Sequence, residues 1–458
     1  MESGISQAFQ ESLTCPMCLG CLTDPITISC GHSFCRACLC LSGEDLKIPV
    51  HCPMCRHPSQ QKDFRTNVVL KKLVSIARQD ILMKYLSSEE HKCVTHKEAK
   101  MIFCEENRVL LCQLCSDSQE HKCHRHCPIE AVAEGQLEKL LKQMASLWEK
   151  IQENQENLEA EDRMTSHWSD YVTLRKEMIR TEYRKVHPVL YEEEKQHIEC
   201  MENEGQALFE KLWKSKDLMA RKRNQLIEMY RELMTVSQQP YVMLLQDLED
   251  MFRRSESVQL CMPQVMKPEL SALPITGLIS KSKCFEVYIS FENAILPCDE
   301  MTPFDVLRRI SFRPYHQETI LESTGHYIAA WGSQSFTSGK YYWEVNLVEP
   351  LDWSVGICKD GCQQTEPECV FLLMCVKQGN QYSLLTTCPG FHHYIEKPVG
   401  WVGVFLDCEG GYVSFLDVAK SSLIYSYPPG TFNYPVRPVI SFSCTCSQEA
   451  VIQYFSAV

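Results

Sequence analysis

Cysteine and histidine residues near the amino end of the chain occur in closely spaced pairs. Seven cysteines and one histidine form four such pairs: Cys15 and Cys18, Cys30 and His32, Cys35 and Cys38, and Cys52 and Cys55. Tetrahedral zinc takes four thiolate or imidazole ligands, and Cys-x-x-Cys pairs supply them two at a time. Eight ligands therefore predict two closed zinc sites with no position left for substrate or water. A disulfide-stapled knot and scattered buried thiols are the alternative interpretations.

The order of these ligands, three cysteines, one histidine and four cysteines, resembles that of a RING finger. The resemblance covers every ligand position and implies a domain over residues 15–56. It also implies a cross-braced arrangement of two zinc ions. One ion would be held by Cys15, Cys18, Cys35 and Cys38, and the other by Cys30, His32, Cys52 and Cys55.

The RING resemblance implies how such a domain would act. Closed zinc sites cannot activate water, so the cysteines would be structural. RING ligases instead position a ubiquitin-conjugating enzyme (E2) that carries ubiquitin, which lowers the entropic barrier to attack by a lysine. Met17 and Pro53 stand at the family's E2-contact positions, and Arg56 stands where a guanidinium would clamp ubiquitin against the E2. Alternatively, Met17 and Pro53 fill loop cores and Arg56 is an ordinary surface charge.

A second group of ligands lies in residues 88–127. It contains Cys93, His96, Cys104, Cys112, Cys115, His121 and His124. The group resembles a type 2 B-box, which implies one ion on Cys93, His96, Cys112 and Cys115 and a second on Cys104, His121 and His124. The resemblance places a fourth ligand, usually Asp, three residues after Cys104, where this chain has Asn107.

Asn107 leaves the second B-box site open to several interpretations. A neutral amide oxygen is a poor zinc ligand compared with a carboxylate. The site is therefore weaker, or it is completed by Glu105, Glu106, Cys123 or His126. A B-box with a single zinc ion is the remaining alternative.

Two segments that flank the RING have apolar residues at helical spacing. They are residues 1–14, with Ile5, Phe9 and Leu13, and residues 67–77, with Val69, Leu73 and Ile76. Either both segments cover the zinc core or, as related RINGs suggest, they form helices that pair two RINGs.

The composition changes over residues 130–255, where Glu, Lys, Gln and Leu dominate. Apolar residues recur there every seven positions, interrupted at Thr165. They are Leu137, Met144, Ile151, Leu158, Val172, Ile179 and Val186, with Leu140 and Leu147 at a companion position and with Leu212, Met219, Leu226 and Leu233 further on. This heptad pattern predicts a coiled coil.

A helix of about 105 residues would span roughly 160 Å and could not bury its apolar stripe alone, so we expect a homodimer. Pro188 lies within the run, where a proline kinks a helix. A hairpin within one chain, broken at Pro188, is the alternative. Pro240 predicts the start of a shorter helix that packs back on the long one, before a linker over residues 255–275.

From about residue 275, short β-rich runs alternate with Gly, Pro and Asn turns. The runs cover residues 340–347, 353–358, 402–407, 411–418 and 437–442. Many short strands separated by turns predict an all-β sandwich. The runs resemble a B30.2 (PRY-SPRY) domain over residues 275–458, which implies substrate selection by loops around residues 359–367 and 387–397.

The order RING, B-box, coiled coil and B30.2 domain resembles the tripartite-motif ubiquitin ligases over essentially the whole chain. The resemblance implies a multidomain α+β fold class, with two small zinc domains, a long antiparallel coiled coil and a C-terminal β-sandwich. We therefore expect an E3 ligase that works with an E2, ubiquitin and a protein substrate. A scaffold that has kept the RING fold without ligase activity is the alternative.

Charge and composition bound the other possibilities. The net charge of −13 argues against broad binding to nucleic acid, which needs basic surface. No apolar run approaches 18 residues, so we expect no membrane span. The 27 cysteines suit a reducing compartment, which indicates a cytoplasmic location with the nucleus as a second possibility.

Overall fold

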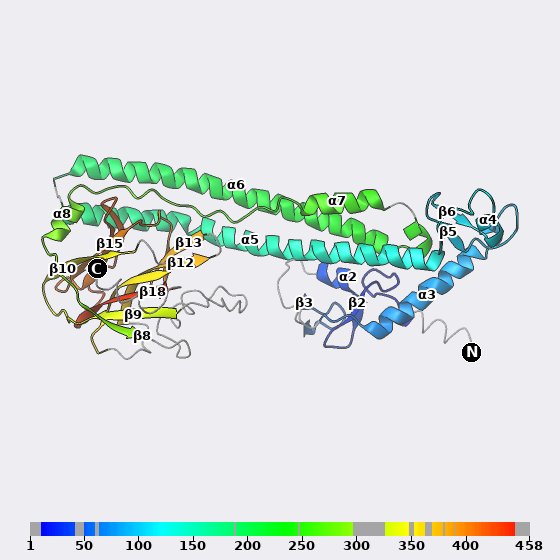
Figure 1. Cartoon of the computed structure of the whole chain (residues 1–458), viewed down its shortest axis with the longest axis horizontal. Helices are drawn as coiled ribbons and strands as arrows, with labels where there is room; N and C mark the ends of the chain where they lie inside the picture. Colours follow the sequence, from blue (N-terminus) through cyan, green and yellow to red (C-terminus); the bar gives the residue numbers. More distant parts are fainter. Residues whose placement is uncertain are drawn as a thin grey trace. The chain divides into compact units, whose positions relative to one another are not determined.

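The structure is a computed structural model that describes residues 11–41, 50–59, 64–186, 189–245, 248–295, 326–347, 352–361, 369–378, 381–388 and 390–444. The chain divides into two units. The first comprises Met1–Arg163 with Lys214–Val265, and the second Met164–Trp213 with Met266–Val458. Two long helices, α5 (Ile129–Val186) and α6 (Tyr191–Ser237), each contribute a segment to both units (Figure 1).

The RING segment of the first unit has little regular structure. Its elements are β1 (Pro25–Thr27), β2 (Ser33–Cys35), α2 (Arg36–Leu41), β3 (Val50–His51) and β4 (Pro58–Ser59). Strand β1 pairs with β2, and β3 pairs with β4, both antiparallel. Buried cysteines share the core of this segment with Phe34 and Leu39. Of the flanking stretch 1–14, residues 1–10 lie outside the described residues, and Leu13 is buried in the same core.

Helix α3 (Val68–Leu86) follows the RING, as the spacing of residues 67–77 predicts. It begins after Asn67, whose side-chain oxygen accepts a backbone N–H bond from the first turn at 3.0 Å. This cap satisfies a donor that the helix itself cannot pair. Val74 packs into the RING core, whereas Val69 and Ile76 are exposed. The helix therefore covers the zinc core with one face and leaves another apolar face in solvent.

The B-box segment is built on a three-stranded antiparallel sheet with the order β6-β5-β7. Its elements are the 3-10 helix η2 (Glu89–His91), β5 (Ile102–Cys104), β6 (Val109–Leu111), α4 (Gln113–Ser116) and β7 (His126–Pro128). Helix α5 starts at Ile129, directly after β7, and Ile129 is fully buried. The sheet and the long helix are therefore joined without a linker.

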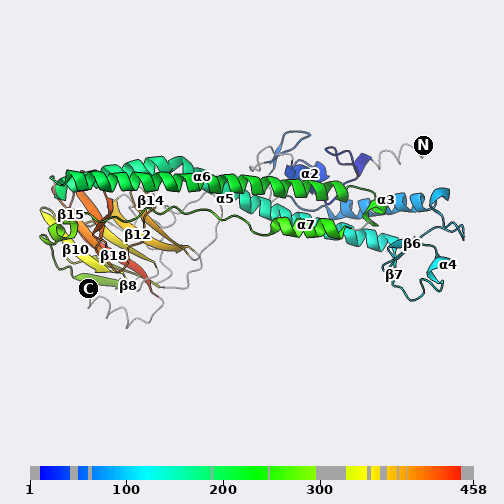
Figure 2. The same cartoon turned by 90° about the horizontal axis from the view of Figure 1, so that it is seen from above.

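The heptad run forms two helices, of 58 and 47 residues, so the prediction of one continuous helix was wrong. The first helix ends at Val186 and the second begins at Tyr191, on either side of Pro188 in the sequence. A proline disfavours a continuous helix, because it lacks a backbone N–H and clashes with the preceding turn. The two helices run side by side (Figure 2). Asn154 Nδ2 donates to the carbonyl of Met219 at 2.9 Å in the first unit, and Trp168 Nε1 donates to that of Gly205 at 2.8 Å in the second. The stripe is thus buried within one chain.

The companion position of α5 changes its chemistry along the helix. Leu140 and Leu147 occupy it near the start. The next five members at seven-residue spacing are polar or aromatic and at most 8% exposed: Asn154, Glu161, Trp168, Arg175 and Glu182. Buried polar groups in a helical seam can fix its register, because each must meet a particular partner.

The chain after α6 folds back on the start of α5, as the shorter helix was predicted to do. It forms η3 (Tyr241–Leu245) and α7 (Glu249–Gln259). Tyr241 and Phe252 share a core with Leu140, and Ser255 Oγ donates to Gln143 Oε1 at 3.2 Å. Among the described residues, no helix combines the length and the apolar character needed to cross a bilayer.

The second unit contains an antiparallel β-sandwich, which confirms the predicted fold class. One sheet has the order β10-β15-β16-β17 and the other β14-β13-β12-β11-β18-β9-β8. The strands are β8 (Phe291–Ile295), β9 (His326–Gly332), β10 (Lys340–Asn346), β11 (Trp353–Lys359), β12 (Val370–Gln378), β13 (Gln381–Thr386), β14 (Phe391–His393), β15 (Trp401–Asp407), β16 (Tyr412–Asp417), β17 (Ser422–Ser426) and β18 (Val436–Cys444). A short helix, α8 (Leu278–Lys283), precedes them. All five predicted runs are strands.

Candidate functional site

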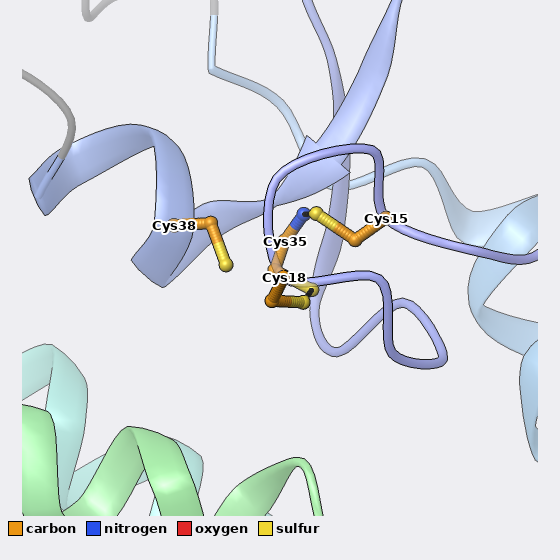
Figure 3. A group of neighbouring side chains, drawn as sticks. All are labelled: Cys15, Cys18, Cys35 and Cys38. Carbon is orange, nitrogen blue, oxygen red and sulfur yellow. Dashed lines mark hydrogen bonds between the residues drawn. The ribbon is translucent and has the colours of Figure 1, made fainter.

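The first RING cluster brings together Cys15, Cys18, Cys35 and Cys38, whose sulfur atoms all lie within 4.8 Å of one another (Figure 3). The first two stand on the loop before β1, Cys35 ends β2 and Cys38 lies on α2. The Sγ atoms of Cys18 and Cys35 are 4.0 Å apart, and all four cysteines are free thiols. Two thiolates on one zinc ion, each about 2.3 Å from it, lie about 3.8 Å apart. The geometry fits zinc and not a disulfide.

The second RING cluster joins Cys30, His32, Cys52 and Cys55. His32 Nδ1 lies 3.2 Å from Cys30 Sγ and 3.7 Å from Cys52 Sγ, again as tetrahedral zinc requires. Each cluster takes its ligands from segments that alternate along the chain. This is the cross-braced grouping that the RING resemblance implies.

The first B-box cluster contains Cys93, His96, Cys112 and Cys115. His96 Nδ1 lies 3.6, 3.3 and 3.4 Å from the three sulfur atoms in that order. The backbone N–H of His96 holds the pKa of Cys93 down to about 6, whereas burial raises the pKa of Cys115 to about 12. The clustered thiolates therefore repel one another, and a bound dication would offset that repulsion. The donor set fits zinc.

The second B-box cluster contains Cys104, His121 and His124. Cys104 Sγ lies 3.4 Å from His124 Nδ1 and 3.7 Å from Asn107 Oδ1. The ligand atoms of Cys104, His121 and His124 therefore lie together, and the Asn107 amide oxygen lies beside Cys104.

Of the other residues considered as fourth ligands at this cluster, three are engaged elsewhere or exposed. The fourth, His126, has a buried Nε2 without a hydrogen-bond partner but does not join the group formed by Cys104, His121 and His124. The Glu106 carboxylate accepts the backbone N–H of Arg125 at 2.8 and 3.0 Å. Glu105 accepts a hydrogen bond from the Cys127 thiol at 3.0 Å. Cys123 is exposed. The chain binds zinc at several sites, in its RING and in this second Cys/His region, and Asn107 distinguishes one site from the rest.

A surface hollow of about 400 Å³ lies beside the second RING cluster. Met17, Pro53 and Arg56, the three residues predicted to contact the E2 and ubiquitin, all line it. Pro53 and Arg56 are exposed and Met17 is half-buried, so the hollow is open to a partner. His51 also lines the hollow and was not predicted, although its place just before the ligand Cys52 could have indicated it. The roles of these residues stay predictions.

The two loops predicted to select the substrate are only partly described. Residues 362–368 and 389 lie outside the described residues. Three residues of the second loop form β14, and two of its residues contact α5. Tyr394 donates its backbone N–H to Tyr171 Oη at 2.9 Å, and Phe391 stacks on Tyr171 with ring centroids 5.9 Å apart. Phe391 and Tyr394 therefore face a helix of their own unit, which argues against the use of these two residues in binding substrate.

Arg175 completes this contact and was missed from the sequence. Its guanidinium donates to the backbone carbonyls of Leu423, at 2.8 Å, and Ile424. Burial lowers the pKa of Arg175. A charged residue at a heptad core position was the signal that could have identified it.

Comparisons with known proteins agree with the RING finger and the C-terminal sandwich. Family models match residues 15–55, as "Zinc finger, C3HC4 type (RING finger)", and residues 340–454, as "SPRY domain". Tripartite motif-containing protein 43C of Mus musculus is 49% identical over 447 residues, which are 96% of this chain and 98% of that protein. Tripartite motif-containing protein 49C of Homo sapiens is 46% identical over 452 residues, 97% of this chain and 99% of that protein.

A solved structure, the crystal structure of the TRIM65 PSpry domain, covers 38% of this chain and 97% of its own, with a TM-score of 0.25 and 12% identity. Those values are too low to support an argument. The two relatives are decisive, because each aligns with this chain almost from end to end at well over 30% identity. The chain therefore belongs to the tripartite motif family.

Proposed function

We propose that this chain is a RING-type E3 ubiquitin ligase that positions a ubiquitin-loaded E2 and recruits protein substrates through its SPRY domain. The observation that carries the proposal is the hollow that Met17, Pro53 and Arg56 share. The three residues come from both ends of the RING sequence, and only a folded zinc platform brings them to one surface.

In this proposal each of the three residues has a separate task. Zinc, when bound, supplies rigidity, because its closed donor sets leave no position for water. Met17 and Pro53 offer apolar contact to the loops of an E2, and the unbranched Met can adapt to their shape. Arg56 has five N–H donors, which can bridge carbonyl groups of the E2 and ubiquitin at once. Catalysis then consists of holding the thioester in the orientation that an incoming lysine can attack.

The backbone at Arg56 supports this task. Its φ of 60° lies in the left-handed region, and its N–H donates to the carbonyl of Cys52 at 2.8 Å. The zinc-binding turn therefore fixes where the Arg56 side chain begins. A fixed starting point reduces the entropy lost when the guanidinium binds.

A self-ubiquitination assay with a panel of purified E2 enzymes tests the proposal. Wild type should build ubiquitin chains, and Met17→Ala and Arg56→Ala should each be far weaker. Arg65→Ala is the matched control, because Arg65 is an exposed arginine of the same region outside the hollow. The zinc content of each variant must equal that of wild type, so that loss of folding is excluded. A fully zinc-loaded wild type that is inert with every E2 would instead leave a binding scaffold.

We also propose a homodimer. Val69, Ile76 and Met83 follow one another at seven-residue spacing on α3 and are 68%, 62% and 39% exposed, which suits pairing with a second α3. In the proposed dimer, α5 and α6 of two copies exchange the contacts that they make within one chain here. Light scattering on the full-length chain should then give twice the mass of one chain, and Ile76→Asp should lower that mass if α3 contributes. A monomer at micromolar concentration would refute the dimer.

Substrate recruitment and location complete the proposal. Proximity labelling with the whole chain, compared with a chain that lacks residues 275–458, should lose most labelled proteins if the SPRY domain selects substrates. The many thiols favour a cytoplasmic location, with the nucleus as the alternative, because a reducing environment keeps them available for zinc. Microscopy of the tagged chain would decide between the two.

A further inference from the structure

Three pairs of zinc ligands in the first unit share one turn geometry. In each, the residue after the second ligand donates its N–H to the carbonyl of the first ligand: Leu19 to Cys15 at 2.9 Å, Arg56 to Cys52 at 2.8 Å and Lys97 to Cys93 at 2.8 Å. The backbone N–H of the first ligand in turn donates to the carbonyl of the residue two positions after the second ligand. These acceptors are Gly20, His57 and Glu98 respectively, each at 2.8 Å. The turn thus places two ligands three residues apart on the same side.

The donor residue of each turn has a positive φ, of 58° at Leu19, 60° at Arg56 and 60° at Lys97. Side chains other than Gly, Asn and Asp rarely adopt this region, so three repeats mark a common structure. The turn between β5 and β6 shares two of these features, the positive φ and the pairing across the turn. Arg108 has a φ of 52°, and Cys104 pairs with Val109, five residues on, as Cys15 does with Gly20. Asn107 therefore stands where the other turns place their second ligand.

The side chain of Asn107 is directed as a ligand would be. Its Oδ1 lies 3.7 Å from Cys104 Sγ, and the equivalent distance from Cys93 Sγ to His96 Nδ1 is 3.6 Å. His121 Nδ1 is buried at the same centre without a hydrogen-bond partner, as a nitrogen aimed at a cation would be. Glu106 Oε2 lies 3.9 Å from Cys104 Sγ, but both oxygens of Glu106 accept the backbone N–H of Arg125.

The charge of the donor set separates this centre from the other three. The others offer three or four thiolates each, whereas this centre offers one thiolate, two neutral imidazoles and a neutral amide. One negative charge leaves a bound Zn²⁺ with a net positive charge. An amide oxygen is also the weakest donor of the four, so water can displace it.

We propose that the Cys104–His121–His124 centre takes the amide oxygen of Asn107 as its fourth zinc ligand and holds an exchangeable ion. The three thiolate-rich centres keep theirs. The B-box then carries one permanent ion and one that the chain loses and regains as free zinc changes. The proposal concerns zinc binding alone and does not depend on ligase activity.

Zinc release from the full-length chain to a chromogenic chelator, with native mass spectrometry for the number of bound ions, tests this. Wild type should bind four ions and release one in a fast phase, followed by three slowly. Asn107→Asp supplies a second negative charge and should slow the fast phase about tenfold or more. Asn107→Ala should speed it or leave three bound ions. Asn203→Asp is the control, because it adds the same charge at an exposed position of α6.

Three results would overturn the proposal. The first is release of all zinc from wild type in a single phase. The second is a fast phase that Asn107→Asp leaves unchanged, or a chain that binds three ions with or without that substitution. The third is a fast phase that Glu106→Gln accelerates and Asn107→Ala does not, which would assign the fourth ligand to Glu106. Asn107→Asp replaces a single non-hydrogen atom of one side chain, so misfolding does not obscure the outcome.

Discussion

The RING segment and the β-sandwich hold their folds by different means. Four of the twelve buried residues in the RING core are zinc-ligand cysteines: Cys15, Cys35, Cys38 and Cys52. The sandwich core instead consists of side chains such as Val404 and Phe415, which are fully buried between two sheets. The RING therefore depends on a few local bonds to metal, and the sandwich on apolar burial spread over many strands. Single changes should act differently on the two.

The largest effect should come from a zinc ligand. Cys38→Ser removes one donor from a closed site, and a structural zinc ion contributes about 10–16 kcal/mol to folding at neutral pH. Hydrogen exchange should show loss of amide protection over residues 15–41, with residues 401–426 unchanged.

Cys40→Ser is the matched control for that variant. Cys40 lies on the same helix, α2, and is buried, which raises the pKa of its thiol to about 12, but it belongs to neither RING cluster. It should keep both zinc ions and the protection of residues 15–41. Equal losses in the two variants would mean that burial, and not metal, holds the RING together.

The second effect should come from a close approach of strands in the sandwich. A Cβ at Gly356 in β11 would lie 2.1 Å from the carbonyl oxygen of Phe371 in β12. Gly356→Ala should therefore lower the free energy of unfolding by about 3 kcal/mol, since neighbouring backbone must move. Gly135→Ala is the contrast, because that glycine lies in a helix with open space around its Cβ and the change should stabilise by about 1 kcal/mol. Thermal unfolding with a fold-sensitive probe measures both.

The third effect is a dependence on pH. Burial, with Arg175 and His392 nearby, holds the pKa of His393 well below its usual value, and its Nε2 lies 3.0 Å from Thr386 Oγ1. Below about pH 6.5 the unfolded chain takes up a proton that the folded chain refuses, so stability falls as pH falls. The slope is about 1.4 kcal/mol per pH unit for one proton.

His393→Gln should lower that slope by the amount that one proton contributes. The slope is obtained from the free energy of unfolding measured between pH 6.5 and 5. The exposed His167→Gln is the control and should follow wild type. Above pH 6.5 His393 is neutral in both the folded and the unfolded chain. The free energy of unfolding of the variant should therefore differ from that of wild type by a constant amount. An unchanged slope in His393→Gln would contradict the assignment.

The comparison also explains what the sequence could predict. Zinc ligands are a local signal, because two of them stand two or three residues apart, and all fifteen predicted ligands converge in four clusters. Spacing alone did not decide whether Asn107 is the fourth ligand of the second B-box site, because that depends on which side-chain oxygen the fold turns toward Cys104. The strands of residues 340–346 and 401–407 were predictable from their apolar, β-branched and aromatic content.

The coiled coil shows where sequence reasoning fails. The residue types of Arg175 and Asn154 do not indicate burial, because charged and polar residues are usually outside. Each is buried because its donors meet a backbone carbonyl far along the chain, at Leu423 and Met219 respectively. Gly205 allows such an approach in the second unit, since a Cβ there would lie 3.0 Å from Val172. The periodicity of α5 does not indicate these distant partners. The hairpin that buries its apolar stripe was considered only as the alternative to a homodimer.

The smallest effect should come from the helix that adjoins the zinc platform. Asn67 caps α3 and its Nδ2 also donates to Thr27 Oγ1 in β1 at 2.9 Å. Asn67→Ala should cost about 1 kcal/mol, the usual value of a lost cap. Asn67→Asp keeps the capping oxygen and should lose less. If metal holds the RING, the Asn67→Ala change should appear as faster hydrogen exchange in the first turn of α3, with the amides around the zinc ligands unaffected. Loosening of both regions together would mean that α3 and zinc support one cooperative fold, and the distinction between metal-held and packing-held parts would then stop at residue 86.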